Sequence, residues 1–229
     1  MITIAAVRKY FINELIAENF TTDRTGAQTI EMIGASFIAD EDAIFGKPND
    51  EYIDAEIEWY DSQSTNINDI PYGDEPPKAW QYAANSHGEI NSNYGHLIYS
   101  DKYYCQFEKV WNELEANPDS RRASMIYTRP SIWEEYNEND KNDFICTNSV
   151  TYYIRDNLLH AVVQMRSNDV IYGYKNDFAW QQFMHHEVIN LYNESLDSDE
   201  DELGTGFMHW QVQNLHVYER HFHLVKEEV

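Results

Sequence analysis

Three segments in the middle of the chain are rich in β-branched and aromatic residues, and they limit the fold more than any other feature of the sequence. They span residues 123–129, 144–154 and 159–166, and the polar stretch 137–143 separates the first two. Such runs favour strands, and their close succession favours neighbouring strands of one sheet. Residues 178–192 are long and apolar enough for a central helix. The sequence therefore predicts a mixed α+β fold in which a sheet supports the chemistry at its edges and loops.

The rest of the chain adds helices and strands to this centre without an internal repeat. We assign residues 1–229 to one domain, because the length suits a single substantial core. Apolar spacing, cap residues and turn residues give the other predicted elements. These are a helix over 1–19, a polar turn over 22–26, a strand over 29–39, a helix over 49–61, a loop over 62–77, a helix over 102–115, a strand that begins at Arg121 and Arg122, an acidic loop over 197–202 and strand-like sequence over 207–225.

The charge of the chain excludes some classes of partner. Forty acidic residues against sixteen basic ones give a formal net charge of -24, which repels nucleic acid and anionic membrane surfaces. No stretch of about twenty apolar residues is present to span a bilayer, and the N-terminus lacks the apolar core of a secretory signal. We therefore expect a cytoplasmic protein that binds neither DNA nor membranes. A small phosphorylated substrate is compatible with this charge if a few arginines gather around it.

The chain has two cysteines, Cys105 and Cys146, which are too few for a disulfide framework and suggest a reducing compartment. Cys146 lies in an apolar run that reads as a strand, so taken alone it is a buried structural residue. Residues 165–170 change this interpretation, because they place a cation, a hydroxyl, an amide and a carboxylate beside apolar strands, with Gly173 and Asp177 following. This concentration of polar groups is typical of a binding loop.

These motifs carry a resemblance to a known family. Residues 166–170 with Gly173 and Asp177 resemble the pyrimidine-binding segment of thymidylate synthases, and other motifs agree with that family in order along nearly the whole chain. They are the loop 23–26, Glu56 with Trp59, Tyr94 with Gly95, Ser120 with Arg121 and Arg122, and residues 215–218. Residues 88–95, 119–122 and 127–131 resemble more closely the phage deoxycytidylate hydroxymethylases, a branch of the same family. The resemblance implies a thymidylate synthase-like mixed sheet flanked by helices.

The resemblance also implies roles for particular residues. Cys146 would be the nucleophile, and a thiolate beside the Arg166 charge is the form that such chemistry needs. Glu56 would hold water and relay protons, and Tyr94 would assist removal of the C5 proton. The phosphate would be bound by Arg24, Arg121, Arg122 and Arg166, and the pyrimidine by Ser167, Asn168 and Asp177. The deoxyribose would be bound by His216 and Tyr218, which alternate on a strand, and the folate by Trp80 and Asp169. The alternative for each arginine alone is a surface ion pair, and the alternative for Glu56 is a solvated surface acid.

Asp177 stands where thymidylate synthases have asparagine. A carboxyl group can accept from the N4 amino group of cytosine and share a proton with N3, whereas asparagine matches uracil. The resemblance therefore implies dCMP as the substrate. The alternative for Asp177 is an ordinary N-cap of the next helix.

The implied reaction transfers a one-carbon unit from 5,10-methylenetetrahydrofolate to C5 of dCMP, with water completing a hydroxymethyl group. The chain stops at Val229, soon after His221 and His223, so we expect most of the C-terminal tail of the synthases to be absent and the site to admit water. A dUMP hydroxymethylase, a thymidylate synthase, and a catalytically silent acidic binding protein are the alternatives. The family also implies a homodimer in which Arg121 and Arg122 reach the active site of the neighbouring chain. Other phage nucleotide-synthesis enzymes are further candidate partners. No metal is expected.

Overall fold

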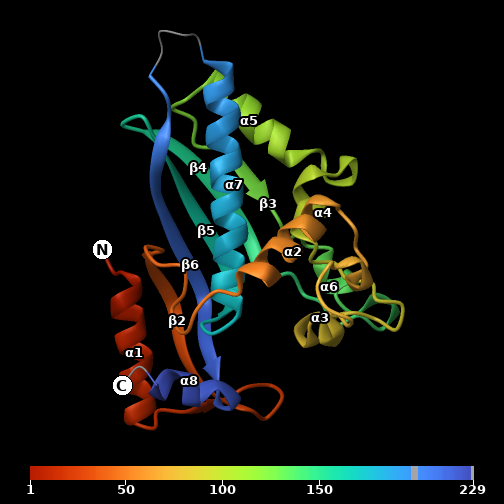
Figure 1. Ribbon diagram of the computed structural model, residues 1–229, viewed down its shortest axis with the longest axis vertical. Helices are drawn as coiled ribbons and strands as arrows, with labels where there is room; N and C mark the ends of the chain where they lie inside the picture. Colours follow the sequence, from red (N-terminus) through yellow and green to blue (C-terminus); the bar gives the residue numbers. More distant parts are fainter. Residues whose placement is uncertain (197–200, 228–229) are drawn as a thin grey trace.

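Six strands form one mixed sheet in the computed structural model, which describes residues 1–196 and 201–227. The strand order across the sheet is β1-β2-β6-β5-β4-β3. The strand bounds are β1 Thr21–Thr22, β2 Gln28–Ile38, β3 Ser124–Ile126, β4 Thr147–Arg155, β5 Leu158–Asp169 and β6 Gly204–Tyr218. The predicted fold class is confirmed, because helices flank this sheet (Figure 1).

The connection between β5 and β6 organises the sheet. β4 and β5 are an antiparallel hairpin whose turn residues Asp156 and Asn157 both have positive φ, as a two-residue hairpin turn requires. β5 and β6 then run parallel, so the chain must cross over the sheet between them, and the long helix α7, Gly173–Ser195, makes that crossover. The other strand pairs are antiparallel.

The helices gather mainly on one side of the sheet and at its end. In Figure 1, α7 lies across β5 and β6, while α2 to α6 form a layer beside it. The helix bounds are α1 Ile4–Ile16, α2 Asp50–Asp61, α3 Lys78–Ala83, α4 Tyr94–Tyr99, α5 Gln106–Ala116, α6 Ile132–Glu135, α7 Gly173–Ser195 and α8 Phe222–Lys226, with 3-10 turns at Ile67–Asp69, Asp101–Tyr103, Glu138–Asp140 and Glu219–His221.

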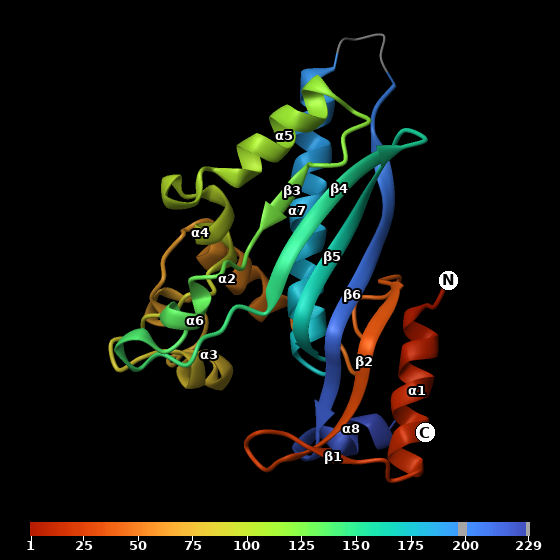
Figure 2. The ribbon, with the colours of Figure 1, turned by 180° about the vertical axis from the view of Figure 1, so that it is seen from behind.

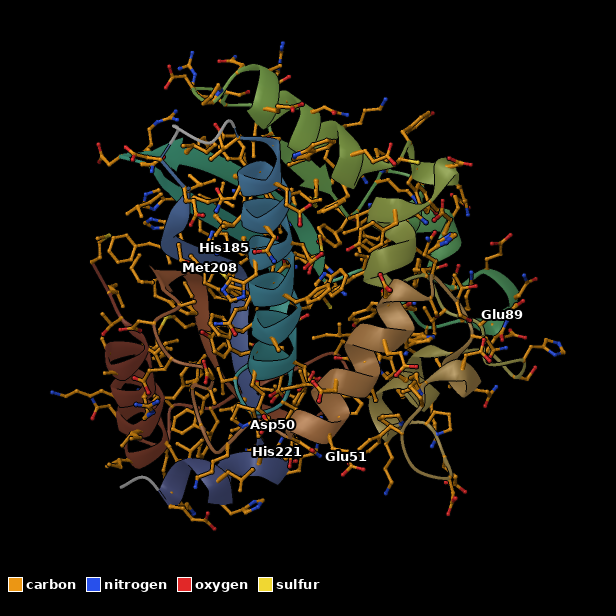
Figure 3. All side chains as sticks on the ribbon, turned by 45° about the horizontal axis from the view of Figure 1, so that its top comes forward. Asp50, Glu51, Glu89, His185, Met208 and His221 are labelled. Carbon is orange, nitrogen blue, oxygen red and sulfur yellow. The ribbon has the colours of Figure 1, made fainter. Side chains whose placement is uncertain are left out.

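The core is one continuous cluster to which the sheet, α7 and the helices α1, α2, α4 and α5 contribute. Trp180 of α7, Tyr152 of β4 and Trp210 of β6 are almost fully buried within it. His185 of α7 and Met208 of β6, both labelled in Figure 3, are buried as well. Aromatic side chains supply much of this core, because each buries a large apolar area.

The opposite face of the sheet is open in the single chain. Seen from behind in Figure 2, no helix formed by residues 1–196 or 201–227 crosses β4, β5 or β6. Ile33, Ile126 and Phe207 are 72%, 58% and 53% exposed on strands β2, β3 and β6. These side chains are spread over strands at different places in the sheet, and the uncovered face that the strands present is a candidate interaction surface.

Several predicted element bounds need correction. α7 begins at Gly173 rather than at residue 178, and Cys146 lies in the extended segment directly before β4 rather than inside the strand. Residues 219–226 form a 3-10 turn and α8, so the prediction of strand up to residue 225 is wrong there. Helices α3 and α4 were not predicted. Arg121 and Arg122 precede β3, and residues 197–200 of the predicted acidic loop lie outside the described residues.

Candidate active site

The thiol of Cys146 lies against the guanidinium of Arg166. Arg166 Nη2 is 3.5 Å from Cys146 Sγ, and its Nε donates to the Ile145 carbonyl at 3.0 Å. Nη2 also donates to the Phe144 carbonyl, and the guanidinium stacks 4.8 Å from the centroid of the Phe144 ring. The backbone carbonyls just before Cys146 thus hold the Arg166 guanidinium in place. The two residues come together because β4 and β5 pair in register, with Arg166 N donating to the Cys146 carbonyl.

The thiol is protonated in the free chain. Burial raises the pKa of Cys146 to about 11, the Arg166 charge lowers it, and the carboxyls of Asp177 and Asp143 raise it. The cation therefore acts in the expected direction, but loss of water around the sulfur outweighs it. Formation of the thiolate at neutral pH requires a further change at the site, such as a base that accepts the proton.

Asp177 lies at the centre of a hydrogen-bonded chain that crosses the site. Asn168 Nδ2 donates to Asp177 Oδ2 at 2.7 Å, and Trp210 Nε1 donates to Asn168 Oδ1 at 3.2 Å. The hydroxyl of Thr147 donates to that of Tyr94 at 2.9 Å, and Tyr94 hydrogen-bonds Asp177 in turn. Asp177 is thus held from β5 and from α4, and Trp210 fixes which way the Asn168 amide faces.

The position of Asp177 on α7 excludes the N-cap alternative. α7 begins at Gly173 and its N-cap position is Tyr172, so Asp177 lies in the second turn. Burial and the nearby charge of Glu56 raise the pKa of Asp177 to about 8, while the bonds from Tyr94 and Asn168 lower it. The carboxyl is therefore predominantly protonated at pH 7 and can both accept and donate a hydrogen bond.

Glu56 is buried, with only 6% of its surface exposed, and two donors meet one of its oxygens. Tyr52 donates its hydroxyl to Glu56 Oε1, and Trp80 Nε1 lies 3.0 Å from the same oxygen. Burial raises the pKa of Glu56, and the bonds from Tyr52 and Trp80 lower it. Trp80 was predicted to contact the folate, and in the free chain its indole nitrogen donates to Glu56.

An aromatic wall surrounds these polar groups. Tyr60 stacks on Tyr94 with ring centroids 5.2 Å apart, and it meets Trp180 edge-on at 5.0 Å. Tyr94 meets Tyr127 edge-on at 5.2 Å, and Trp59 meets Trp80 at 5.0 Å. This wall removes water from around the carboxyls, which is the physical cause of their raised pKa values. The sequence reasoning missed Tyr60, Tyr127 and Trp180 as parts of the site.

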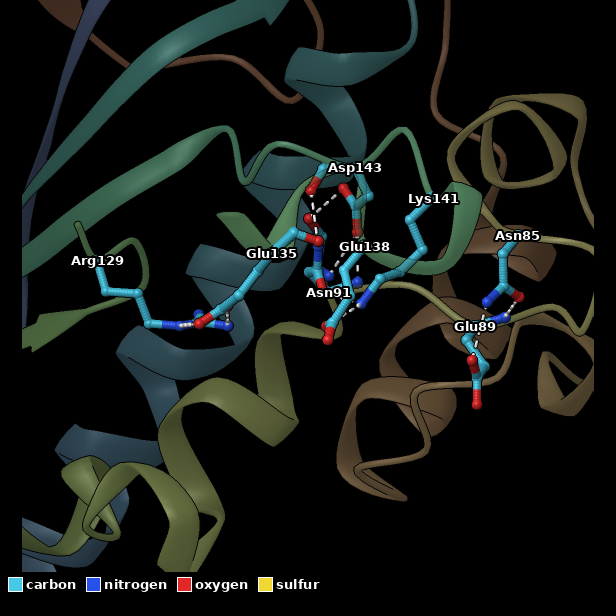
Figure 4. A network of polar contacts seen from close by, with 9 residues as sticks. Asn85, Glu89, Asn91, Arg129, Glu135, Glu138, Lys141 and Asp143 are labelled. Carbon is cyan, nitrogen blue, oxygen red and sulfur yellow. Dashed lines mark hydrogen bonds and ion pairs between the residues drawn. The ribbon is translucent and has the colours of Figure 1, made fainter. Parts of the chain in front are cut away.

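A second buried carboxylate, Asp143, fixes the backbone that leads to Cys146. It accepts from the backbone N–H of Asn91 at 2.6 Å and of Ser92 at 2.8 Å, and from the Ser92 hydroxyl at 2.6 Å. Asn91 is held in addition by Lys141, and Figure 4 shows this network around the polar loop. Asp143 therefore ties the segment before Cys146 to the one before Tyr94. The sequence analysis did not predict that Asp143 and its partners hold the segment before Cys146.

The predicted sugar-binding residues His216 and Tyr218 come from β6, and the predicted phosphate-binding residue Arg24 comes from the turn between β1 and β2. The rings of His216 and Tyr218 on β6 meet edge-on with centroids 4.9 Å apart, so the two residues share a face as predicted. The charges of Asp23, Asp169 and Cys146 all act on Tyr218, so these groups surround it. Exposed Arg24 is presented by a turn in which Asp23 Oδ1 accepts from the N–H groups of Thr25 and Ala27.

Two other predicted contacts have local structural partners. Asp169 Oδ1 accepts from the N–H groups of Ile171 and Tyr172, and its Oδ2 lies 3.9 Å from His221 Nδ1. Asp169 thus shapes the turn that starts α7. Ser167 pairs with Asn214 of β6, one residue from Asn168 on β5.

Arg121 and Arg122 are not brought to Cys146 of their own chain. They are exposed, and Arg122 Nε forms an ion pair with Glu113 of α5 at 2.9 Å. β3 pairs Ser124 with Thr151, five residues along β4 from Cys146, or roughly 17 Å at 3.3 Å per residue. They also flank the opposite edge of the sheet from Arg24. One chain therefore contributes only part of the predicted arginine set to its own site.

Two absences among the described residues concern metal ions and membranes. In residues 1–196 and 201–227, no group of three or more His, Cys, Asp or Glu side chains is arranged to hold a metal ion. Within the same ranges, no helix is both long and apolar enough to cross a membrane.

Comparison with known proteins gives consistent matches. The family model described as thymidylate synthase matches residues 11–229. The deoxycytidylate 5-hydroxymethyltransferases of Enterobacteria phages T4 and T2 are each 49% identical to this chain over 223 residues, which cover 97% of this chain and 89% of each relative. The thymidylate synthase of Francisella philomiragia subsp. philomiragia is 23% identical over 222 residues, which cover 90% of this chain and 77% of that protein.

Proposed function

Because the chain belongs to the thymidylate synthase family, we propose that it is an enzyme that hydroxymethylates C5 of dCMP. The family implies a pyrimidine nucleotide and methylenetetrahydrofolate as co-substrates. The observation that carries the choice of dCMP is the Asp177 carboxyl, held by Asn168 and protonated at neutral pH. The 49% identity to the phage deoxycytidylate 5-hydroxymethyltransferases supports the same choice.

One group of site residues acts on the pyrimidine base of the substrate. Cys146 adds to C6, which makes C5 nucleophilic toward the one-carbon unit that the folate supplies. Asp177 accepts a hydrogen bond from N4 and shares its proton with N3, where negative charge would otherwise develop. Tyr94 assists removal of the C5 proton, and Glu56 holds the water that completes the hydroxymethyl group. The reaction consumes one water and releases tetrahydrofolate, so the folate is not oxidised.

The phosphate and the deoxyribose are assigned to a second group of residues, of which Arg166 also contacts Cys146. Arg24 and Arg166 bind the phosphate, Ser167 and Asn168 bind beside the pyrimidine, and His216 and Tyr218 hydrogen-bond the deoxyribose. Trp80 and Asp169 remain proposed folate neighbours, in addition to their contacts within the chain. The proximity of Tyr218 to the Arg24 turn and to Cys146 supports this orientation.

We propose that two chains share their active sites in a homodimer. The open face of the sheet and the distance between Arg122 and Cys146 of one chain support this arrangement. Mixing an Arg122→Ala chain with a Cys146→Ala chain should restore part of the activity, because one of the two mixed sites then has both residues intact. Absence of complementation in a mixture that still forms dimers would reject shared sites. The phage relatives further support a role in nucleotide synthesis inside an infected cell, beside other phage enzymes of that synthesis.

The test of the function is direct. Purified protein is incubated with methylenetetrahydrofolate and, separately, with dCMP, dUMP or CMP, and the nucleotides are analysed by mass spectrometry. Addition of the elements of formaldehyde to dCMP is expected. Conversion of dUMP with dCMP left unchanged would overturn the proposal, with added methyl indicating a synthase. No mass change with any nucleotide would favour a silent binding protein.

A further inference from the structure

The hydroxyl of Tyr52 is directed at Glu56 and has no role in the chemistry described above. Tyr52 lies four residues before Glu56, which places both side chains on one face of α2. Its hydroxyl donates to Glu56 Oε1 and accepts from Trp80 Nε1 at 3.0 Å. Its ring is held edge-on against Tyr72, with centroids 5.1 Å apart. Packing and hydrogen bonds thus hold the Tyr52 hydroxyl as a donor to the buried carboxylate, beside the Trp80 indole.

Tyr52 remains a donor throughout the working pH range. Burial and the charge of Glu56 raise its pKa far above the ordinary value, so the phenol keeps its proton. A permanent donor stabilises the ionised form of its acceptor and not the protonated form. The contact therefore favours Glu56 as a carboxylate.

Glu56 is coupled to Asp177, so its ionisation also affects the residue that reads the base. The Glu56 charge is the second largest cause, after burial, of the raised pKa of Asp177. Two carboxyls in a dry region resist simultaneous ionisation, and the proton stays on the one whose anion is less well stabilised. The titratable groups that surround the pair are Tyr52, Tyr60, Tyr94, Tyr127 and Cys146, with Arg166 beyond the thiol. The tyrosines stay neutral because burial raises their pKa values.

We propose that Tyr52 is a positioning residue that keeps Glu56 ionised and thereby keeps the shared proton on Asp177, where the enzyme recognises cytosine. The inference rests on the proposed function, because it assigns Asp177 to the base. Removal of the Tyr52 hydroxyl would let the proton move toward Glu56. The enzyme would then lose both the carboxylate that holds water and the protonated carboxyl that faces N3.

The first experiment measures kcat/KM for dCMP against pH in wild type and in Tyr52→Phe. Loss of a hydrogen bond to a charged group should move the acidic limb upward by about one pH unit, because Glu56 then protonates more readily. The maximum of the profile should fall, because part of the singly protonated pair then carries its proton on Glu56 and not on Asp177. The basic limb should not move downward, because loss of the donor also destabilises the pair in which both carboxyls are ionised. Tyr72→Phe is the matched control, since its hydroxyl bonds Asn49 and not Glu56, and it should leave the profile unchanged.

The second experiment reads Asp177 without relying on activity. In protein carrying ¹³C at the aspartate carboxyls, the Asp177 signal is identified by its absence in Asp177→Asn. Its titration midpoint should lie near pH 8 in wild type and at lower pH in Tyr52→Phe, while thermal unfolding confirms that the variant is folded. An Asp177 midpoint and a pH profile that both match wild type would overturn the inference. Wild type that leaves dCMP unchanged would instead overturn the proposed function, whatever the midpoints are.

Discussion

Replacing Asp177 by asparagine should change the base that the enzyme prefers. The substitution keeps the size of the side chain, and its amide oxygen can still accept from Asn168, which Trp210 prevents from turning over. The amide nitrogen then points to where the protonated carboxyl faced the base. This group donates but does not accept, so it matches O4 of uracil and opposes the N4 amino group of cytosine.

The size of the effect follows from the number of mismatched groups. Cytosine loses an acceptor for N4 and the shared proton at N3, and each unpaired group in a dry site costs about 2 kcal/mol. Two such losses give about 4 kcal/mol, or about a thousandfold in relative catalytic efficiency. Uracil gains matching partners, so the ratio of kcat/KM for dCMP to that for dUMP should fall at least this far.

The assay is a pair of initial-rate series with dCMP and dUMP at fixed methylenetetrahydrofolate. Asn176→Ala is the matched control, because its side chain neighbours Asp177 in sequence but projects from a different face of α7. It should leave the ratio within about threefold of wild type, a change below ~0.7 kcal/mol. If Asp177→Asn stays folded and its ratio also lies within threefold of wild type, Asp177 does not select the base.

Three further predictions test other parts of the site. In a Cys105→Ser background, alkylation of Cys146 by iodoacetamide should speed up about tenfold per pH unit from pH 7 to 9 without levelling, because its pKa is about 11; a plateau near pH 8.5 would contradict this. Gly95→Ala places Cβ 1.8 Å from the Tyr60 carbonyl oxygen, so its melting temperature should fall by at least about 6 °C, and an unchanged value would refute the contact. Asp177 has a raised pKa in the folded state, so the stability it contributes is full below pH 4 and is lost as pH rises through about 8. The melting temperature of Asp177→Asn should therefore gain on wild type from pH 5 to 8 and then run parallel; a constant difference would argue against that pKa.

Long patterned segments could be predicted from the sequence. The helix with Asn49 as N-cap has the expected start, and the Asn49 side chain accepts from Tyr52 N. Strand alternation also put His216 and Tyr218 on one face, which their ring contact confirms. In both cases the signal is local, since a cap or a period of two needs no knowledge of the rest of the fold.

Features that depend on tertiary contacts could not be predicted in this way. α7 begins at Gly173 without a side-chain cap, and packing against the sheet overrides the weak helical preference of its first residues. The short helices α3 and α4 have too few residues for a period to be recognised. Trp80 reaches Glu56 from a separate helix, so no spacing in the sequence announces that bond. Tyr52 could have been found, because a hydroxyl four residues before a buried glutamate shares its helix face.

The two faces of the sheet have different surroundings, although the same strands make both. On β5, Val163 and Met165 are buried under α7, whereas Gln164 between them is exposed on the open face and bonds Gln211 of β6. A shift of β5 by one residue would exchange these sides all along the strand and would also displace Arg166 from Cys146. A substitution in β5 therefore affects both the surface of the open face and the geometry of the candidate site around Cys146, which limits the sequences that are compatible with this strand.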